Sequence, residues 1–121
     1  MSNPVNWFEI YVQDMPRAKA FYEAVFSTTL THMRGDVDMF GFPSDTNGPG
    51  VAGALVSMQG FPSGKNSVLV YFRCDDCAIE ADKAVKAGGR MQKPKTAAGE
   101  YGFIALVHDS EGNMIGLHSM K

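Results

Sequence analysis

Three polar side chains, Glu9, Tyr71 and His118, stand in otherwise apolar, strand-like stretches of this 121-residue chain. A histidine beside a carboxylate in an apolar cleft can act as a general base that its partner orients, with a pKa near neutrality. A tyrosine hydroxyl can donate a hydrogen bond to a ligand oxygen. We therefore predict acid–base chemistry by Glu9 and His118, assisted by Tyr71. The alternative is that the three form a buried hydrogen-bonded cluster that only holds the structure together.

Cys74 and Cys77 form a C-x-x-C pair at the end of a predicted strand, a spacing that also occurs in redox proteins. The start of a helix lowers the pKa of a thiol, but the two aspartates between the cysteines oppose that effect by like-charge repulsion. Strand alternation turns Cys74 toward the core. We interpret both cysteines as small packing residues and leave redox chemistry as the alternative.

The elements that position these residues occur twice. A shift of 62 positions superposes Trp7–Val12 on Leu69–Cys74. This shift is close to half the chain length. Two diverged copies of one unit explain this best, so we expect module one at 1–60 and module two at 66–121. The linker between them is too short to separate independent domains, and we predict a single domain over 1–121.

Each half shows the same order of signals: a strand, a helix and three further strands. Asp14 and Asp76 are expected to be helix N-caps, with Pro16 in the first turn of the first helix. Gly88 is expected to end the second helix in a left-handed conformation. The predicted fold class is α+β. The expected strands are 6–12, 28–33, 37–42 and 51–58 in the first half, and 67–74, 91–93, 102–108 and 113–119 in the second.

Composition excludes several function classes. Lys plus Arg is 11 and Asp plus Glu is 13, giving a net charge of −2 without a basic block, so no nucleic-acid partner is expected. No apolar run approaches about 18 residues, so no membrane partner is expected. The first residues carry neither a basic segment nor an apolar run, which predicts a cytoplasmic protein. Eight Met, eight Phe and four Tyr indicate an adaptable apolar cavity, although Met also fills gaps in ordinary cores.

Two strings carry a resemblance to a known family: WFEIYVQD near the start and DSEGNMIGLH near the end. Paired modules with these strings resemble the vicinal oxygen chelate superfamily of glyoxalases, bleomycin resistance proteins and extradiol dioxygenases. The resemblance spans about 5–119 and is nearest to the branch related to lactoylglutathione lyase. It implies two βαβββ modules whose paired, curved, mixed sheets enclose a central cleft. It also implies a homodimer, since many relatives form their clefts between chains.

The resemblance also suggests which residues line the cleft. Metal-dependent relatives place His, Glu or Gln ligands at positions that are Trp7, Ala54, Leu69 and Gly116 here, and none of these side chains binds a divalent metal. We therefore expect no cofactor, with an atypical divalent metal held by Glu9 and His118 as the alternative. The expected ligand-binding residues are Trp7, Tyr11, Val56, Leu69, Arg73 and Met114.

Two functions remain open at this point. The first is a glyoxalase-like lyase, isomerase or dioxygenase-related enzyme of unknown substrate that uses Glu9 and His118. The second is a metal-free binding protein of the bleomycin-resistance type, which sequesters a small molecule in a cleft lined by Met and aromatic residues. A glyoxalase isomerisation needs a metal to polarise the enediolate oxygens. The missing ligand set therefore favours binding or metal-independent chemistry, and the fold alone does not choose.

Overall fold

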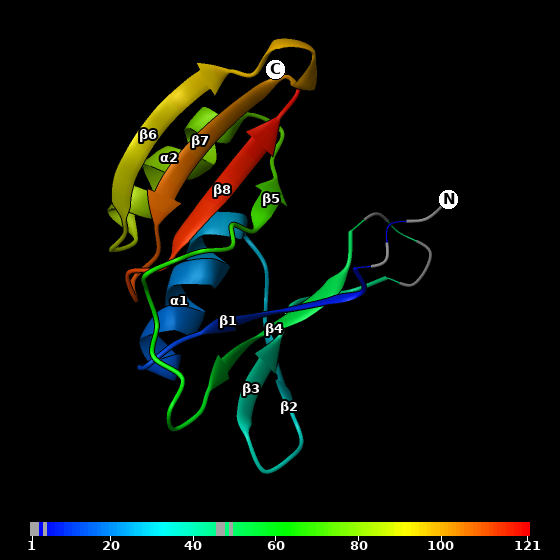
Figure 1. Cartoon of the computed structure of the whole chain (residues 1–121), viewed down its shortest axis with the longest axis vertical. Helices are drawn as coiled ribbons and strands as arrows, with labels where there is room; N and C mark the ends of the chain where they lie inside the picture. Colours follow the sequence, from blue (N-terminus) through cyan, green and yellow to red (C-terminus); the bar gives the residue numbers. More distant parts are fainter. Residues whose placement is uncertain (1–2, 4, 46–47, 49) are drawn as a thin grey trace.

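The computed structural model describes residues 3, 5–45, 48 and 50–121 of the chain, and it contains two successive βαβββ modules, as predicted (Figure 1). Module one comprises β1 (Trp7–Tyr11), α1 (Met15–Phe26), β2 (Thr31–Met33), β3 (Asp38–Gly41) and β4 (Ala52–Ser57). Module two comprises β5 (Tyr71–Arg73), α2 (Cys77–Lys86), β6 (Arg90–Ala97), the short 3-10 helix η1 (Gly99–Tyr101), β7 (Phe103–His108) and β8 (Met114–Ser119).

Each module forms its own four-stranded mixed sheet. The strand orders are β1-β4-β3-β2 and β5-β8-β7-β6, and in both sheets the first strand runs parallel to the last one. Glu9 pairs with Ala54 and Tyr71 pairs with Gly116, so the parallel partner lies 45 residues later in both modules. An identical pairing offset is what two copies of one unit produce.

Both helices begin at the predicted caps. The Asp14 side chain accepts a hydrogen bond from the backbone N–H of Arg17, and the Asp76 side chain accepts one from Ala78, each at 3.1 Å. These bonds satisfy backbone donors that a helix start leaves without partners. The second helix ends at Lys86 with Ala87 as its C-cap, and Gly88 follows with a φ of 102°, in the left-handed region that favours glycine.

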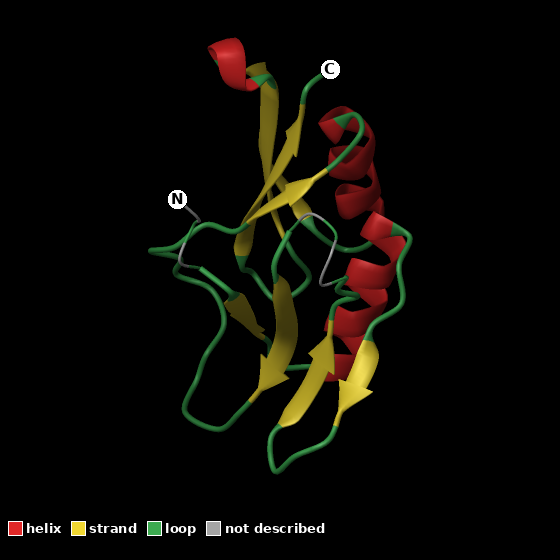
Figure 2. Ribbon diagram, turned by 90° about the vertical axis from the view of Figure 1, so that its right-hand side faces the viewer, coloured by secondary structure: helices red, strands yellow, loops and turns green. Residues whose placement is uncertain are grey.

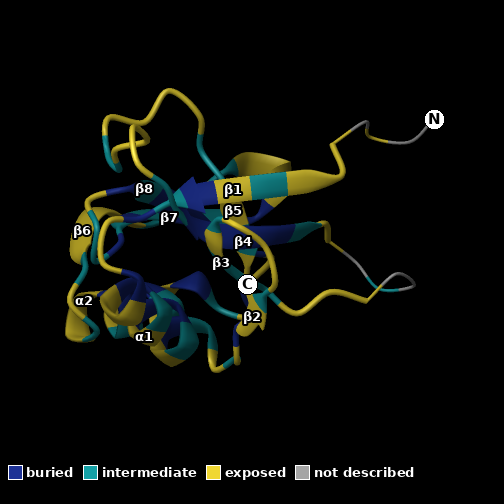
Figure 3. Ribbon diagram, turned by 90° about the horizontal axis from the view of Figure 1, so that it is seen from below, coloured by how far each residue is buried: buried dark blue, intermediate teal, exposed yellow. Residues whose placement is uncertain are grey.

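The two helices contact each other and lie one above the other on the same side of the strands (Figure 2). Segments of buried residues, dark blue in Figure 3, lie where the helices and the sheets face each other. Phe21 and Tyr22 of α1 pack there with Leu55 and Leu117 from the two sheets, and all four side chains are almost completely buried. Residues that alternate with the buried ones point away from the helices. We call this second side of the two sheets the open face.

Two predicted strands of module two have different bounds in the structure. The strand expected at 67–74 is only Tyr71–Arg73, because the Asn66 side chain takes the place of the backbone ladder before it. Asn66 accepts a hydrogen bond from the backbone N–H of Met114 and donates one to its carbonyl oxygen. The strand expected at 91–93 runs over Arg90–Ala97, where irregular pairing with β7 accommodates Pro94.

The other strands fall close to the predicted ranges, and the strand expected at 28–33 forms only over Thr31–Met33. Between β3 and β4, residues 46–47 and 49 lie outside the described residues. No helix in the described part of the chain is long and apolar enough to cross a membrane.

Candidate functional site

Glu9 lies on the open face of β1 between two residues that point the same way. The Trp7 indole donates a hydrogen bond to Oε2 at 3.0 Å, and the Tyr11 hydroxyl donates one to Oε1 at 2.6 Å. The bond from Tyr11 and then the bond from Trp7 lower the pKa of Glu9, because both stabilise the ionised form. The carboxylate is therefore an oriented, exposed anion and a weaker base than an ordinary glutamate.

Tyr71 takes the same place in module two, and its ring lies over Gly116 of the neighbouring strand β8. A Cβ atom at Gly116 would overlap the carbon atoms of the Tyr71 ring, so the ring fits only because residue 116 is glycine. The ring is 49 % exposed and presents an aromatic surface on the open face.

Next to the Tyr71 ring, module two contains a cavity of about 360 Å³, which we call the open-face pocket. Tyr101, Ile104 and His118 border it together with Tyr71, Phe72 and Arg73. His118 Nε2 lies 2.5 Å from the carbonyl oxygen of Tyr101. A carbonyl oxygen only accepts, so Nε2 donates this hydrogen bond, and Nδ1 is the ring nitrogen that remains for a ligand.

Glu9 and His118, the predicted acid–base pair, are not neighbours within one chain. Glu9 borders a cavity of about 370 Å³ together with Tyr11 and Met114, whereas His118 borders the open-face pocket. His118 follows Met114 by four residues along β8, a distance of about 13 Å. Within the described part of the chain, no hydrogen bond and no shared cavity joins Glu9 to His118. The chain also does not bury them with Tyr71 as one cluster, because Glu9 and Tyr71 are exposed.

The remaining predicted ligand-binding residues are distributed over both sheets. Trp7 borders a cavity of about 300 Å³ with Met33 and Ala52, Val56 is buried, and Leu69 lies just before β5. Arg73 is exposed and borders three cavities, including the open-face pocket.

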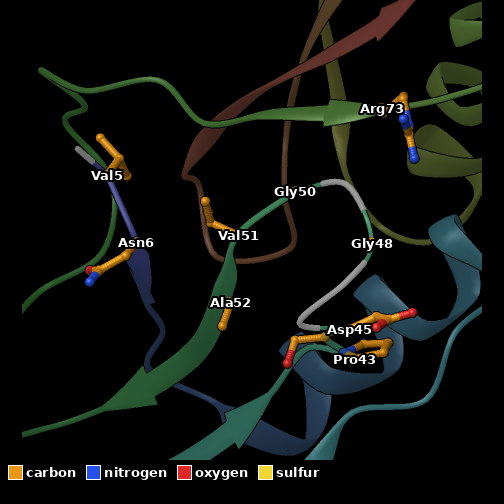
Figure 4. A pocket seen from close by; sticks show the side chains of 10 residues that line it. Val5, Asn6, Pro43, Asp45, Gly48, Gly50, Val51, Ala52 and Arg73 are labelled. Carbon is orange, nitrogen blue, oxygen red and sulfur yellow. The ribbon is translucent and has the colours of Figure 1, made fainter. Parts of the chain in front are cut away.

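Two of these three cavities lie where the modules meet. One has a volume of about 700 Å³, and we call it the seam pocket; its walls include Phe8, Phe26, Phe42 and Phe72. An adjoining cavity of about 650 Å³ shares Pro43, Gly50, Val51 and Arg73 with it. Figure 4 shows this second cavity, with the Arg73 side chain directed toward the loop that carries Gly48.

The segment Asp109–Asn113 joins the two modules, a role that its place in the string DSEGNMIGLH did not indicate. Asp109 is buried and accepts hydrogen bonds from the Tyr22 hydroxyl at 2.6 Å and from Asn113 Nδ2 at 3.0 Å. Asn113 Nδ2 also donates to the backbone carbonyl of Tyr11, and Asn113 Oδ1 accepts from Gly64 in the linker.

Glu111 completes this junction. Its buried carboxylate accepts hydrogen bonds from the backbone N–H groups of Gln13 and Asp14, and Arg17 Nε donates to Oε2 at 2.6 Å. Burial works against ionisation, but these hydrogen bonds outweigh it and lower the pKa of Glu111 to about 2. The sequence did contain both members of this pair, Glu111 before the last strand and Arg17 after the helix cap Asp14. Nothing in the sequence showed that these two segments lie together.

The described residues contain no group of three or more His, Cys, Asp or Glu side chains that could hold a metal ion. Gly116, one of the four positions at which the family resemblance implies a metal ligand, has the Tyr71 ring in the space that a side chain would need. Cys74 and Cys77 are buried free thiols, and burial raises the pKa of the Cys74 thiol to about 12. This is the opposite of the low thiol pKa that redox cysteines need.

Comparison with known proteins supplies a family. A family model described as "Glyoxalase/Bleomycin resistance protein/Dioxygenase superfamily" matches residues 5–117. Among curated proteins, none matches significantly.

Solved structures show the same fold. A glyoxalase-related enzyme from Fulvimarina pelagi is 16% identical with a TM-score of 0.73, over 98% of this chain and 88% of that one. Fosfomycin resistance protein FosX from Mesorhizobium loti is 17% identical with a TM-score of 0.68, over 98% and 93%. A glyoxalase I variant from Zea mays is 19% identical with a TM-score of 0.70, over 97% of this chain and 47% of that one. At these identities the likeness concerns the fold.

Proposed function

Because the chain belongs to the Glyoxalase/Bleomycin resistance protein/Dioxygenase superfamily, we propose that it binds a small organic molecule on the open face without the help of a metal ion. The observation that carries this proposal is the Tyr71 ring over Gly116. In metal-dependent relatives this position supplies a ligand, whereas here an aromatic surface fills the space. The other corresponding positions, Trp7, Ala54 and Leu69, offer no donor that suits a divalent metal.

The open-face pocket supplies the contacts that such a ligand needs. The exposed Tyr71 ring offers a flat apolar surface, and the Ile104 side chain adds a second apolar wall. The His118 ring offers Nδ1 to a polar group of the ligand, since its other nitrogen already binds the Tyr101 carbonyl. Apolar walls with a few oriented polar groups are typical of small-molecule sites. At about 360 Å³ the pocket suits a compact ligand.

A homodimer is part of the proposal. The open face leaves Trp7 at 38 % and Tyr71 at 49 % exposure, and large aromatic side chains of this kind are enriched where a second protein packs. In a dimer whose modules face each other across the interface, Glu9 of one chain and His118 of the other line one cleft. Acid–base chemistry by this pair is the second candidate function, and the position of both side chains on the open face favours it.

Purified protein tests the proposal in two measurements. Native mass spectrometry gives the oligomeric state and any co-purifying molecule, and elemental analysis gives the metal content. We expect a dimer with much less than one Zn²⁺ or Ni²⁺ per chain, and no turnover of the methylglyoxal–glutathione hemithioacetal. A stoichiometric, tightly held metal would contradict metal-independent binding.

Variants separate binding from catalysis. His118→Ala should weaken binding of the co-purifying molecule while the melting temperature stays close to that of the wild type. Glu9→Gln should leave binding intact if the protein only sequesters its ligand. A Glu9→Gln variant that binds normally but no longer converts its ligand would instead favour the acid–base enzyme.

A further inference from the structure

The seam pocket is built mainly from aromatic side chains that the two modules contribute jointly. Phe72 of β5 lies with its ring centroid 4.6 Å from Phe26, 5.7 Å from Phe42 and 6.3 Å from Phe8, all of module one. These separations are typical of favourable aromatic pairs. The four rings are only partly buried although they pack against the core, so they present aromatic surface to the cavity.

The backbone makes room for this arrangement. The Phe8 ring lies against Gly53 of β4, where a Cβ atom would overlap the ring carbons. The volume of about 700 Å³ lies within the range of sites for drug-sized ligands. An aromatic cavity of this size stabilises a flat apolar group by removing it from water.

Charge adds a second requirement for the ligand. Arg73 is the one charged side chain among the described residues that line the seam pocket, and Asp45 borders only the adjoining cavity. Within the described part of the chain, no hydrogen bond or ion pair engages the Arg73 guanidinium. A guanidinium without a partner beside an apolar wall recognises carboxylate, sulfonate and phosphonate groups, because its N–H groups match the geometry of their oxygens.

We propose that the seam pocket is a second ligand site, distinct from the open-face pocket, that takes an organic anion with a flat aromatic body. The aromatic body packs against Phe8, Phe26, Phe42 and Phe72, and the anionic group binds Arg73 at the edge. The two sites share Tyr71, Phe72 and Arg73, whereas His118 borders only the open-face pocket and Val51 lies at the seam. This division allows an experiment to tell them apart.

Two fluorescent dyes that differ in one group test the proposal on the full-length protein. Anilinonaphthalene sulfonate carries the anionic group, and phenylnaphthylamine has the same ring system without it. We expect Arg73→Gln to weaken binding of the sulfonate about tenfold and to leave binding of the neutral dye within about twofold. Arg34→Gln is the matched control, because it removes the same charge from an exposed residue that borders neither pocket.

Two further variants locate the dye. Val51→Trp should block the seam pocket and weaken both dyes, and the 46 % exposure of Val51 lets the fold tolerate the larger side chain. A melting curve of this variant checks folding. His118→Ala should leave the binding of both dyes unchanged. The proposal is overturned if Arg73→Gln affects both dyes equally or neither, or if His118→Ala rather than Val51→Trp abolishes binding. Those results would leave the metal and mass-spectrometric tests of the open face unaffected.

Discussion

Arg17 Nε lies 2.6 Å from Glu111 Oε2, and this ion pair joins the first helix of module one to the last hairpin of module two. The Glu111 side chain is buried, whereas Arg17 remains 56 % exposed. Much of the stabilisation by Glu111 therefore comes from its hydrogen bonds to the backbone N–H groups of Gln13 and Asp14, for which the described residues offer no other acceptor. One side chain thus closes the start of α1 and fixes the second module against it.

Glu111→Ala should destabilise the protein by about 1 to 3 kcal/mol, because it removes the charged acceptor of the backbone N–H groups of Gln13 and Asp14 and the ion pair with Arg17. The free energy of unfolding from urea titration measures this. Asp82→Ala is the control, since Asp82 forms an exposed pair with Lys86 on α2 and its loss should cost less than about 0.5 kcal/mol. Equal effects of the two substitutions would show that the buried junction contributes no more than a surface ion pair.

The low pKa of Glu111 predicts a pH dependence of stability. Its pKa is about 2 in the folded protein against an ordinary value of 4.5, so the unfolded chain binds a proton more readily. The contribution of Glu111 is therefore complete above about pH 4.5 and is lost as the pH falls toward 2. The stability difference between wild type and Glu111→Gln should shrink over this interval. A difference that stays constant from pH 6 to pH 3 would rule out this coupling.

The local elements of the fold followed from the sequence, since short-range signals set them. Asp14, Asp76 and Gly88 mark helix ends by bonds and backbone angles that involve only nearby residues. The duplication revealed the order of elements in both modules. The predicted bounds of β5 were wrong for a physical reason. The Asn66 side chain binds the backbone of Met114 in place of strand pairing, and this contact joins residues 48 positions apart.

Less of the candidate site could be predicted from the sequence, because its residues come from both modules. Strand alternation placed Glu9 and Tyr71 on one face, as the structure has them, but it did not show which side chains meet across the modules. The packing of Phe26 against Phe72 and the junction at Glu111 depend on how α1 meets module two. No periodicity within either module encodes that docking, so residues at the seam escaped notice.

The close approach of the Tyr71 ring to Gly116 predicts the effect of a side chain at this position of β8. Gly116→Ala should destabilise the protein by about 1 to 3 kcal/mol, because the new methyl group displaces the Tyr71 ring. In a Tyr71→Ala background the same change should be neutral or slightly stabilising, since alanine suits a strand better than glycine does. Chemical denaturation of the wild type, the two single variants and the double variant measures the coupling. Purely additive effects would mean that the ring does not occupy the space above Gly116.

The buried cysteines give a last prediction, which separates packing from redox chemistry. Burial raises the pKa of Cys74 to about 12, and the side chain of Cys77 is completely inaccessible. Ellman's reagent attacks only thiolates that it can reach, so at pH 8 the native thiols should react at least about a hundredfold more slowly than those of the chain in guanidinium. Cys74→Ala and Cys77→Ala assign any residual rate to one thiol. Rapid reaction of either thiol in the folded protein, or a disulfide formed under mild oxidation, would restore the redox interpretation of the C-x-x-C pair.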